Sequence, residues 1–178
     1  MGGTANQIKN FIIDVDGVMT DGTFTYTADG KTAKVFGSDD SDGLALIKDF
    51  VNIHFITGDK RGYPITEKRI KTDMKMKLDQ VSTIERADWI EAHYGLNESI
   101  YMGDGIFDAM VFDRVAYAIA PSNAIFLAKE HADHVTKASG GHGAVAEACF
   151  HIAEKFFEPL DPLNLKLNNS HSVWDDNN

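Results

Sequence analysis

The chain has little of what cross-links proteins or places them in membranes. It contains one cysteine, Cys149, which excludes an intrachain disulfide and a cysteine-rich zinc site. No apolar run reaches the roughly 18 residues that a membrane span requires. Residues 1–10 also lack an apolar stretch of signal-peptide length. We therefore expect a cytoplasmic protein with no membrane partner.

Basic residues are scarce as well. The chain has 17 Lys and Arg against 27 Asp and Glu, which gives a net charge of -10. A surface with this much negative charge repels nucleic acid, and we therefore expect no nucleic-acid partner. An anionic substrate must meet a local positive patch or a metal ion. The 178 residues suit one domain, which we expect over residues 1–158, followed by a polar, mobile tail over 159–178.

Short apolar runs alternate with amphipathic segments. The runs predict buried strands over residues 11–15, 53–56, 100–102, 116–119 and 134–136. Helices are expected over residues 41–50, 64–72, 82–95 (from a capping box at Ser82), 104–114, 122–131 and 144–157. This alternation predicts an α/β fold, a doubly wound parallel sheet with helices on both faces. Asp29–Gly30 predicts the turn of an added β-hairpin over about residues 23–36.

Acids and glycines follow three of these strands. Asp14 and Asp16 end the first strand before a turn at Gly17. Two carboxylates this close repel each other unless a cation lies between them, and Mg²⁺ prefers such oxygen ligands. Ligands bind where parallel strands end, so we expect these acids at the functional site.

The other two strand ends carry weaker signals. Thr57 and Gly58 offer a hydroxyl and backbone N–H groups to an anion. Asp104 and Asp108 lie four residues apart after the third strand, although Asp108 alone is also typical of an acid at a helix N-terminus.

Together the three motifs resemble the haloacid dehalogenase superfamily of phosphotransferases. The resemblance implies that Asp14 is the nucleophile and Asp16 the general acid/base. It implies that Thr57 binds phosphate, and that the metal, Mg²⁺, lies near Asp14, Asp16, Asp104 and Asp108, with Asp108 orienting the metal site.

The segment DVDGVMTDG, the hairpin after it and the glycine-rich residues 139–145 resemble a capless branch of that superfamily. The branch holds phosphatases of 3-deoxy-D-manno-octulosonate 8-phosphate and of related nine-carbon keto-sugar acids. The likeness covers roughly residues 8–157. It implies a Rossmann-like fold without a cap domain, an aspartyl-phosphate intermediate, a role in lipopolysaccharide biosynthesis, and a homotetramer in which a neighbour covers the hairpin.

Substrate contacts are expected from glycines, a hydroxyl and charged side chains near the strand ends. They are Gly17, Thr57, Gly58, Asp40, Lys60 and His142. Lys60 can add positive charge near the substrate, or it can be a solvent-exposed residue at the start of a helix. His142 lies between glycines, where an exposed loop histidine is equally expected.

One part departs from the family pattern. The family carries a lysine before the helix that precedes the third strand, and this chain has none there. Arg86 is the first candidate for the missing cation because arginine grips phosphate with two N–H groups. Lys75 and Lys77 are the alternatives, and Arg86 can also be a surface residue of its helix.

Several rival interpretations stay open. The chain can act on another small sugar phosphate, or it can be a catalytically weak relative that serves as an assembly or binding subunit. A receiver-like signalling domain fits poorly, because its phosphoacceptor follows a later strand. Residues 38–49 nearly match a calcium-binding loop, but Ser38 replaces the first acidic ligand.

Overall fold

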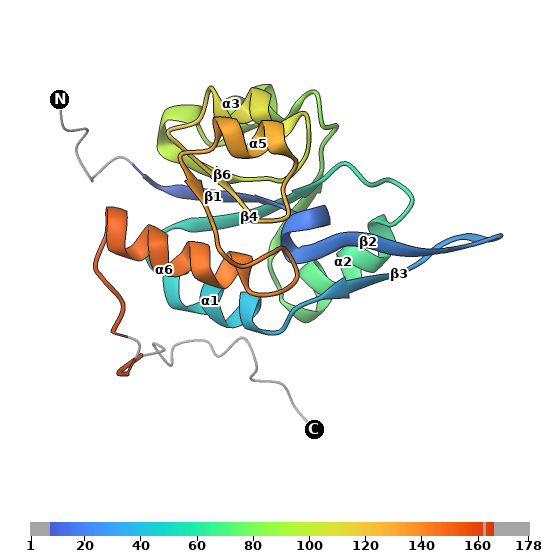
Figure 1. The fold of residues 1–178 in the computed structure, drawn as a ribbon, viewed down its shortest axis with the longest axis horizontal. Coiled ribbons are helices and arrows are strands. Elements are labelled where there is room, and N and C mark those ends of the chain that lie inside the picture. Colours follow the sequence, from blue (N-terminus) through green and yellow to red (C-terminus); the bar gives the residue numbers. More distant parts are fainter. Residues whose placement is uncertain (1–7, 162, 166–178) are drawn as a thin grey trace.

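A computed structural model describes residues 8–161 and 163–165 (Figure 1). Six parallel strands form the main sheet, in the order β5-β4-β1-β6-β7-β8. Their bounds are β1 Asn10–Asp14, β4 Asn52–Thr57, β5 Lys77–Gln80, β6 Ser99–Met102, β7 Tyr117–Ala120 and β8 His134–Val135. The doubly wound parallel sheet predicted from the sequence is confirmed.

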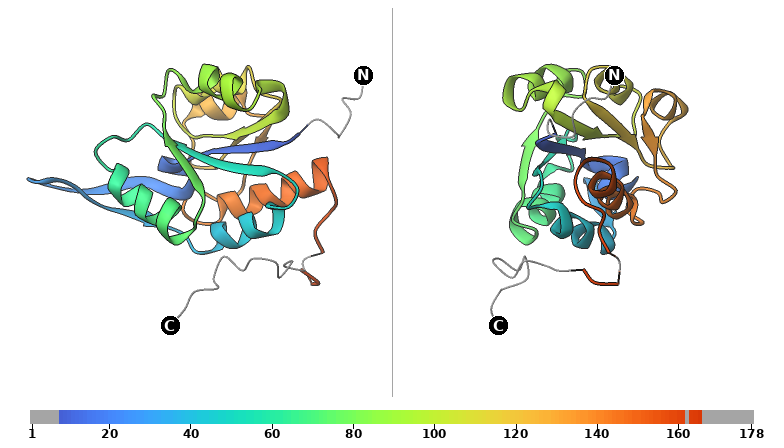
Figure 2. Two further views of the ribbon diagram at one scale, coloured as in Figure 1. Left: turned by 180° about the vertical axis from the view of Figure 1, so that it is seen from behind. Right: turned by 90° about the vertical axis from the view of Figure 1, so that its left-hand side faces the viewer.

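Helices cover both faces of this sheet. The bounds are α1 Asp39–Ile47, α2 Tyr63–Glu67, α3 Arg86–His93, α4 Asp108–Phe112, α5 Phe126–His131 and α6 Ala144–Phe156, with shorter turns η1 Val15–Met19, η2 Lys68–Asp73 and η3 Leu96–Glu98. Figures 1 and 2 show α1 and α6 on one face and α3 and α5 on the other. Side chains of β1 alternate accordingly: Phe11 and Ile13 pack with the α1 and α6 layer, and Ile12 packs with α3 and α4.

The predicted hairpin is also confirmed. Strands β2 (Thr20–Thr27) and β3 (Gly30–Phe36) pair only with each other, as a separate antiparallel sheet. They project from the body of the molecule in Figures 1 and 2. Gly30 closes the turn with a φ of 116°, a conformation that a side chain would strain. No further domain is inserted among residues 8–161, in agreement with a capless fold.

The structure corrects several element predictions. Strand β5 was not expected, because only Leu78 of its four residues is buried. The capping box at Ser82 does not start a helix: α3 begins at Arg86, and its N-terminus has no side-chain cap. Helix α1 begins at Asp39, so the expected start at Ser41 is wrong. Since α1 spans most of residues 38–49, this segment does not form a calcium loop.

Most of the tail expected over residues 159–178 lies outside the described part of the chain. Across residues 8–161 and 163–165, no helix combines the length and apolar character needed to cross a bilayer.

Candidate active site

The site lies where the winding of the sheet reverses. β1 pairs with β4 on one side and β6 on the other, and the chain continues outward in both directions. Asp14 is the last residue of β1, and Asp104 follows the end of β6 by two residues. Strand ends beside such a reversal leave a crevice open for ligands. Two of the predicted acids are therefore brought together by topology.

A tight turn after β1 brings the second strand end close. Gly17, in η1, has a φ of 87°, which favours glycine. A Cβ at this position would lie 1.9 Å from Asp104 Oδ2, so the carboxylate rests directly against the turn. Oxygens of Asp14, Asp104 and Asp108 all lie within 4.8 Å of one another. These three carboxylates form a cluster suited to a divalent metal ion.

Arg86 lies at the centre of this cluster. One guanidinium nitrogen donates to Asp14 Oδ2 at 2.8 Å, and another donates to Asp14 Oδ1 at 3.0 Å. The first also contacts Asp108 Oδ1 at 2.6 Å. Arg86 is 3% exposed and Asp14 4%, so this is a buried bidentate ion pair, not a surface contact. The first helical residue of α3 thus delivers a cation to the end of β1.

Tyr101 and Asp108 complete the buried network. The Tyr101 hydroxyl donates to Asp108 Oδ1 at 2.6 Å and accepts from Arg86 at 2.9 Å. The other oxygen of Asp108 accepts the backbone N–H groups of Asp104 and Gly105, at 3.0 and 2.8 Å. Both Asp108 oxygens are thus occupied by protein donors. Through these contacts Asp108 orients the loop after β6, while Arg86 holds both oxygens of Asp14.

Burial shifts the pKa values of these acids strongly. Desolvation raises the pKa of Asp14 to about 8, against the lowering effect of Arg86. Desolvation, with the nearby Asp108 charge, raises the pKa of Asp104 to about 7. Burial lowers the pKa of Arg86, but Asp14, Tyr101 and Asp108 outweigh it, so the guanidinium stays charged. One cation faces three carboxylates, and a divalent metal ion would balance the excess negative charge of the ionised groups.

Asp16 faces the same site from the turn after β1. Its Oδ2 accepts the hydroxyl of Thr57 at 3.0 Å, and its Oδ1 contacts Lys34 Nζ at 2.7 Å. Lys34 also contacts Asp59, which a second hairpin lysine, Lys31, contacts at 2.6 Å. Partial burial raises the pKa of Asp59, but hydrogen bonds from both lysines outweigh it, and the pKa falls below its ordinary value.

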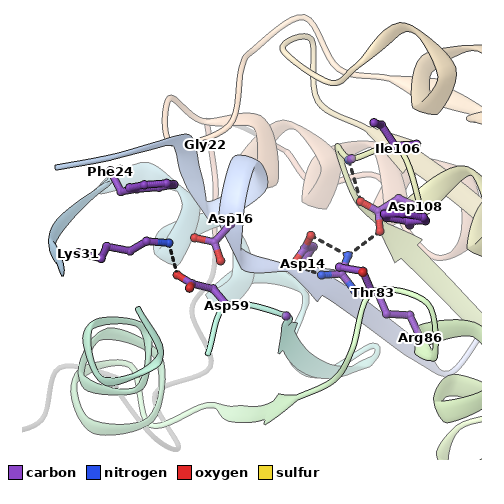
Figure 3. A pocket seen from close by; sticks show the side chains of 13 residues that line it. Asp14, Asp16, Gly22, Phe24, Lys31, Asp59, Thr83, Arg86, Ile106 and Asp108 are labelled. Atoms are coloured by element: carbon purple, nitrogen blue, oxygen red, sulfur yellow. Dashed lines mark hydrogen bonds and ion pairs between the residues drawn. The ribbon is translucent and has the colours of Figure 1, made fainter. Parts of the chain in front are cut away.

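A pocket of about 260 Å³ joins these groups. Figure 3 shows Asp14, Arg86 and Asp108 on one side, with Asp16, Asp59 and Lys31 on the other. The remaining lining residues are Gly22, Phe24, Gly58, Thr83, Gly105, Ile106 and Phe107. The pocket thus reaches both of the acids assigned to catalysis by the resemblance, and two members of the carboxylate cluster, Asp14 and Asp108, line it.

Not every predicted site residue reaches the pocket. Asp40 is fully buried, and its Oδ1 accepts the N–H groups of Val145 and Ala146 at 3.0 and 3.1 Å. Asp40 therefore accepts hydrogen bonds from backbone N–H groups at the start of α6. The expected substrate contact of Asp40 is not supported. Lys60 and His142 are exposed and are not among the residues that line the pocket.

The alternatives to Arg86 also lie elsewhere. Lys75 and Lys77 are exposed, and neither lines the pocket. Sequence reasoning missed Lys34, Asp59 and Tyr101. Nothing in the local pattern marks them, because each reaches the site through a contact between distant segments. The alternation of polar residues in the hairpin is typical of a solvated ribbon.

No family model matches the chain, but individual proteins do. The 3-deoxy-D-manno-octulosonate 8-phosphate phosphatase KdsC of Escherichia coli K12 is 34% identical over 151 residues, which span 82% of this chain and 79% of the relative. KdsC of Haemophilus influenzae is 32% identical over 147 residues, 79% of this chain and 80% of the relative. This chain belongs to the KdsC family.

Solved structures agree with the KdsC family assignment. A 3-deoxy-D-manno-octulosonate 8-phosphate phosphatase from Moraxella catarrhalis, in complex with magnesium, phosphate and KDO, has a TM-score of 0.74 and 27% identity, covering 84% of this chain and 88% of that one. A putative haloacid dehalogenase superfamily hydrolase from Legionella pneumophila has a TM-score of 0.74 and 30% identity, covering 84% of each chain. As a member of the KdsC family, the chain is a phosphoric monoester hydrolase of the haloacid dehalogenase type.

Proposed function

We propose that the chain hydrolyses a phosphorylated 2-keto-3-deoxy sugar acid, either 3-deoxy-D-manno-octulosonate 8-phosphate or a nine-carbon relative, with Mg²⁺ as cofactor. The observation that carries this proposal is the buried pairing of Arg86 with Asp14 near Asp104, in the lining of a pocket that Asp16 also lines. The names of the KdsC relatives supply the substrate class.

The residues at the cluster fit a magnesium ion. Asp14 and Asp104 offer hard carboxylate oxygens, and the Asp16 carbonyl is the third protein ligand that the family resemblance implies. The acids outnumber the cations beside them, and burial, with the charges of neighbouring acids, raises the pKa values of Asp14 and Asp104. When bound, the ion neutralises the repulsion between a phosphate and the carboxylates.

Asp14 acts as the nucleophile in this proposal. Its carboxylate attacks phosphorus, the bond to the sugar oxygen breaks, and an aspartyl phosphate forms. Arg86 lines the pocket and contacts both Asp14 oxygens, so it holds the carboxylate in a fixed direction and places positive charge beside the transferred group. Gly58 lines the pocket too, next to Thr57.

Asp16 acts as the general acid and base in this proposal. It protonates the leaving sugar oxygen in the first step, and in the second it takes a proton from the water that hydrolyses the aspartyl phosphate. The Asp16 side chain is 32% exposed, so it can reach a bound substrate, while Thr57 holds one of its oxygens at 3.0 Å.

Assembly and location are further parts of the proposal. Phe24, Tyr26 and Val35 are about half exposed on the hairpin, and a homotetramer in which a neighbour covers them is what the family resemblance implies. The cytoplasm, expected from the sequence, is the proposed location.

The test is Mg²⁺-dependent phosphate release from a panel of sugar phosphates that includes the eight- and nine-carbon keto-acid phosphates. We expect a strong preference for one keto-acid phosphate, and Asp14→Asn should lower the rate at least about 1,000-fold while the protein stays folded. Preference for another sugar phosphate would replace the substrate class. Release from none, with Mg²⁺ bound, would indicate an inactive binding subunit.

A further inference from the structure

Strand β3 of the hairpin sends a buried lysine into the site. The Lys34 side chain is 0% exposed, and its ammonium contacts Asp16 Oδ1 at 2.7 Å, Asp59 Oδ2 at 2.8 Å and Thr66 Oγ1 at 2.8 Å. These oxygens come from η1, from the loop after β4, and from α2. An ammonium has three N–H donors, so every donor of Lys34 has a partner.

Asp16 is held at both oxygens as a result. Lys34 contacts Oδ1, and the Thr57 hydroxyl donates to Oδ2 at 3.0 Å. The Thr57 oxygen in turn accepts the backbone N–H of Asp59 at 3.1 Å, which directs the hydroxyl proton toward Asp16. A carboxyl group held at both of its oxygens has little freedom to rotate. It nevertheless stays open to the pocket, with 32% of the side chain exposed.

The local backbone is shaped to admit this lysine. A Cβ on Gly62 would lie 2.7 Å from Lys34 Cε, 2.7 Å from Lys31 Cδ and 2.2 Å from Asp59 Oδ2. Glycine at this position therefore leaves the space through which both lysine chains reach Asp59. Lys31 runs beside Lys34 but packs on the ring of Phe24 and pairs with Asp59, with no ion pair to Asp16.

We propose that Lys34 is a positioning residue, which fixes the carboxyl group of Asp16 toward the leaving-group oxygen and so makes the hairpin part of the catalytic apparatus. This inference rests on the proposed function, which assigns general acid/base catalysis to Asp16. A carboxyl group already held in its working direction needs no reorganisation during the reaction. Because β2 and β3 pair only with each other, these ion pairs link the ribbon to the catalytic turn.

The test compares two lysines of the same strand. Lys34→Met removes the ammonium that holds Asp16, and Lys31→Met removes one that pairs with Asp59 alone. Leaving-group release is measured in a single turnover for 3-deoxy-D-manno-octulosonate 8-phosphate and for p-nitrophenyl phosphate. The sugar alkoxide needs a proton as it leaves, whereas p-nitrophenolate does not, and general acid catalysis is worth about 10²–10⁴-fold.

We expect Lys34→Met to slow the sugar phosphate at least about 30-fold more than the aryl phosphate, as partial loss of that acid catalysis. Lys31→Met should slow the two substrates by similar factors. Equal slowing of both substrates by Lys34→Met would overturn the positioning role. If wild-type protein releases neither leaving group, the proposed function itself fails, so the two failures are distinguishable.

A second variant covers the case in which Lys34→Met does not fold. Thr66→Val keeps the lysine and both acids but removes the third acceptor of the ammonium, in a buried position where valine has a similar shape. The same selective loss is expected, about three-fold, since one of three contacts is removed. An unselective change in Thr66→Val, with thermal unfolding unaltered, would contradict the proposal.

Discussion

The guanidinium of Arg86 contacts both carboxylate oxygens of Asp14, at 2.8 and 3.0 Å, across 72 positions of the chain. Both residues are buried, and the pair joins the start of α3 to the end of the central strand β1. A bidentate pair fixes direction as well as distance. The chain therefore places a cation against Asp14 even though it lacks the lysine of its family's pattern.

Removing this cation should be costly for folding. Arg86→Ala leaves Asp14 and Asp108 buried without their counter-charge, and we expect the free energy of unfolding to fall by about 3–5 kcal/mol. Urea denaturation in metal-free buffer measures the change. The matched control is Arg114→Ala, whose pair with Asp88 is exposed and should contribute less than about 1 kcal/mol. Similar losses for the two variants would contradict the structural role of Arg86.

Gly17→Ala should impair metal binding through a steric clash, in addition to straining the backbone. The new methyl would occupy the space of the Asp104 carboxylate, 1.9 Å from its Oδ2. We expect Mg²⁺ affinity, measured by calorimetry, to fall at least about ten-fold, since one metal ligand is displaced. Gly95→Ala is the control: φ there is also positive, at 74°, but a Cβ would meet nothing within 4 Å. That variant should lose about 1 kcal/mol of stability and keep its Mg²⁺ affinity.

Asp40 should matter for stability and not for substrate binding. Asp40→Ala leaves two N–H groups at the start of α6 without their acceptor, at an expected cost of about 0.5–2 kcal/mol. Asp40→Asn retains an oxygen acceptor and should cost less. Both variants should keep the wild-type KM, measured by phosphate release. A raised KM in Asp40→Asn at unchanged stability would restore the substrate contact expected from the sequence.

Two partly buried histidines should make the fold less stable in mild acid, a contribution opposite in sign to that of Asp14 and Asp104, whose raised pKa values favour folding as pH falls. Burial lowers the pKa of His54 below its ordinary value of 6.5, with Asp79 opposing the shift, and burial also lowers the pKa of His151. The unfolded chain binds these protons more readily, so this contribution is complete above pH 6.5 and is lost as pH falls through the folded pKa values.

Each such group adds a slope of at most about 1.4 kcal/mol per pH unit. Chemical denaturation between pH 5 and pH 8 measures the difference in stability between the wild type and each variant, in which the contributions of Asp14 and Asp104 cancel. Relative to the wild type, His54→Gln should gain stability as pH falls, and adding His151→Gln should increase that gain. A difference that does not change with pH in the double variant would contradict the role of the histidines.

The sequence predicted those site residues that lie at the ends of strands. Asp14 and Asp104 lie at or just after the ends of apolar runs, so their approach to one another follows from a parallel sheet. Arg86 was one of three candidates, and sequence alone could not choose among them. The choice depends on how α3 is placed against β1, which tertiary packing determines.

Other features were hidden because local patterns do not encode them. The KLDQ segment of β5 has one buried side chain and forms a strand only because β4 offers it an edge. Lys34 looks like any lysine of an exposed ribbon, and its burial depends on Gly62, 28 positions away. The hydrogen bonds between Asp40 and the start of α6 could not be predicted, because an acid that accepts N–H groups of a distant helix looks, in sequence, like one that faces a ligand.

The two parts of the site, the end of β1 and the hairpin, differ in how easily they open. The backbone before Asp14 is hydrogen-bonded to β4 and β6 on both sides, so it can open only when the whole sheet separates. The exposed part of the hairpin beyond Thr20, by contrast, pairs with no other strand and is held to Asp16 and Asp59 by side chains, so it can detach in a local event of lower free energy. Entry of substrate and exit of product are therefore expected along the hairpin side, past a framework that stays closed at Asp14.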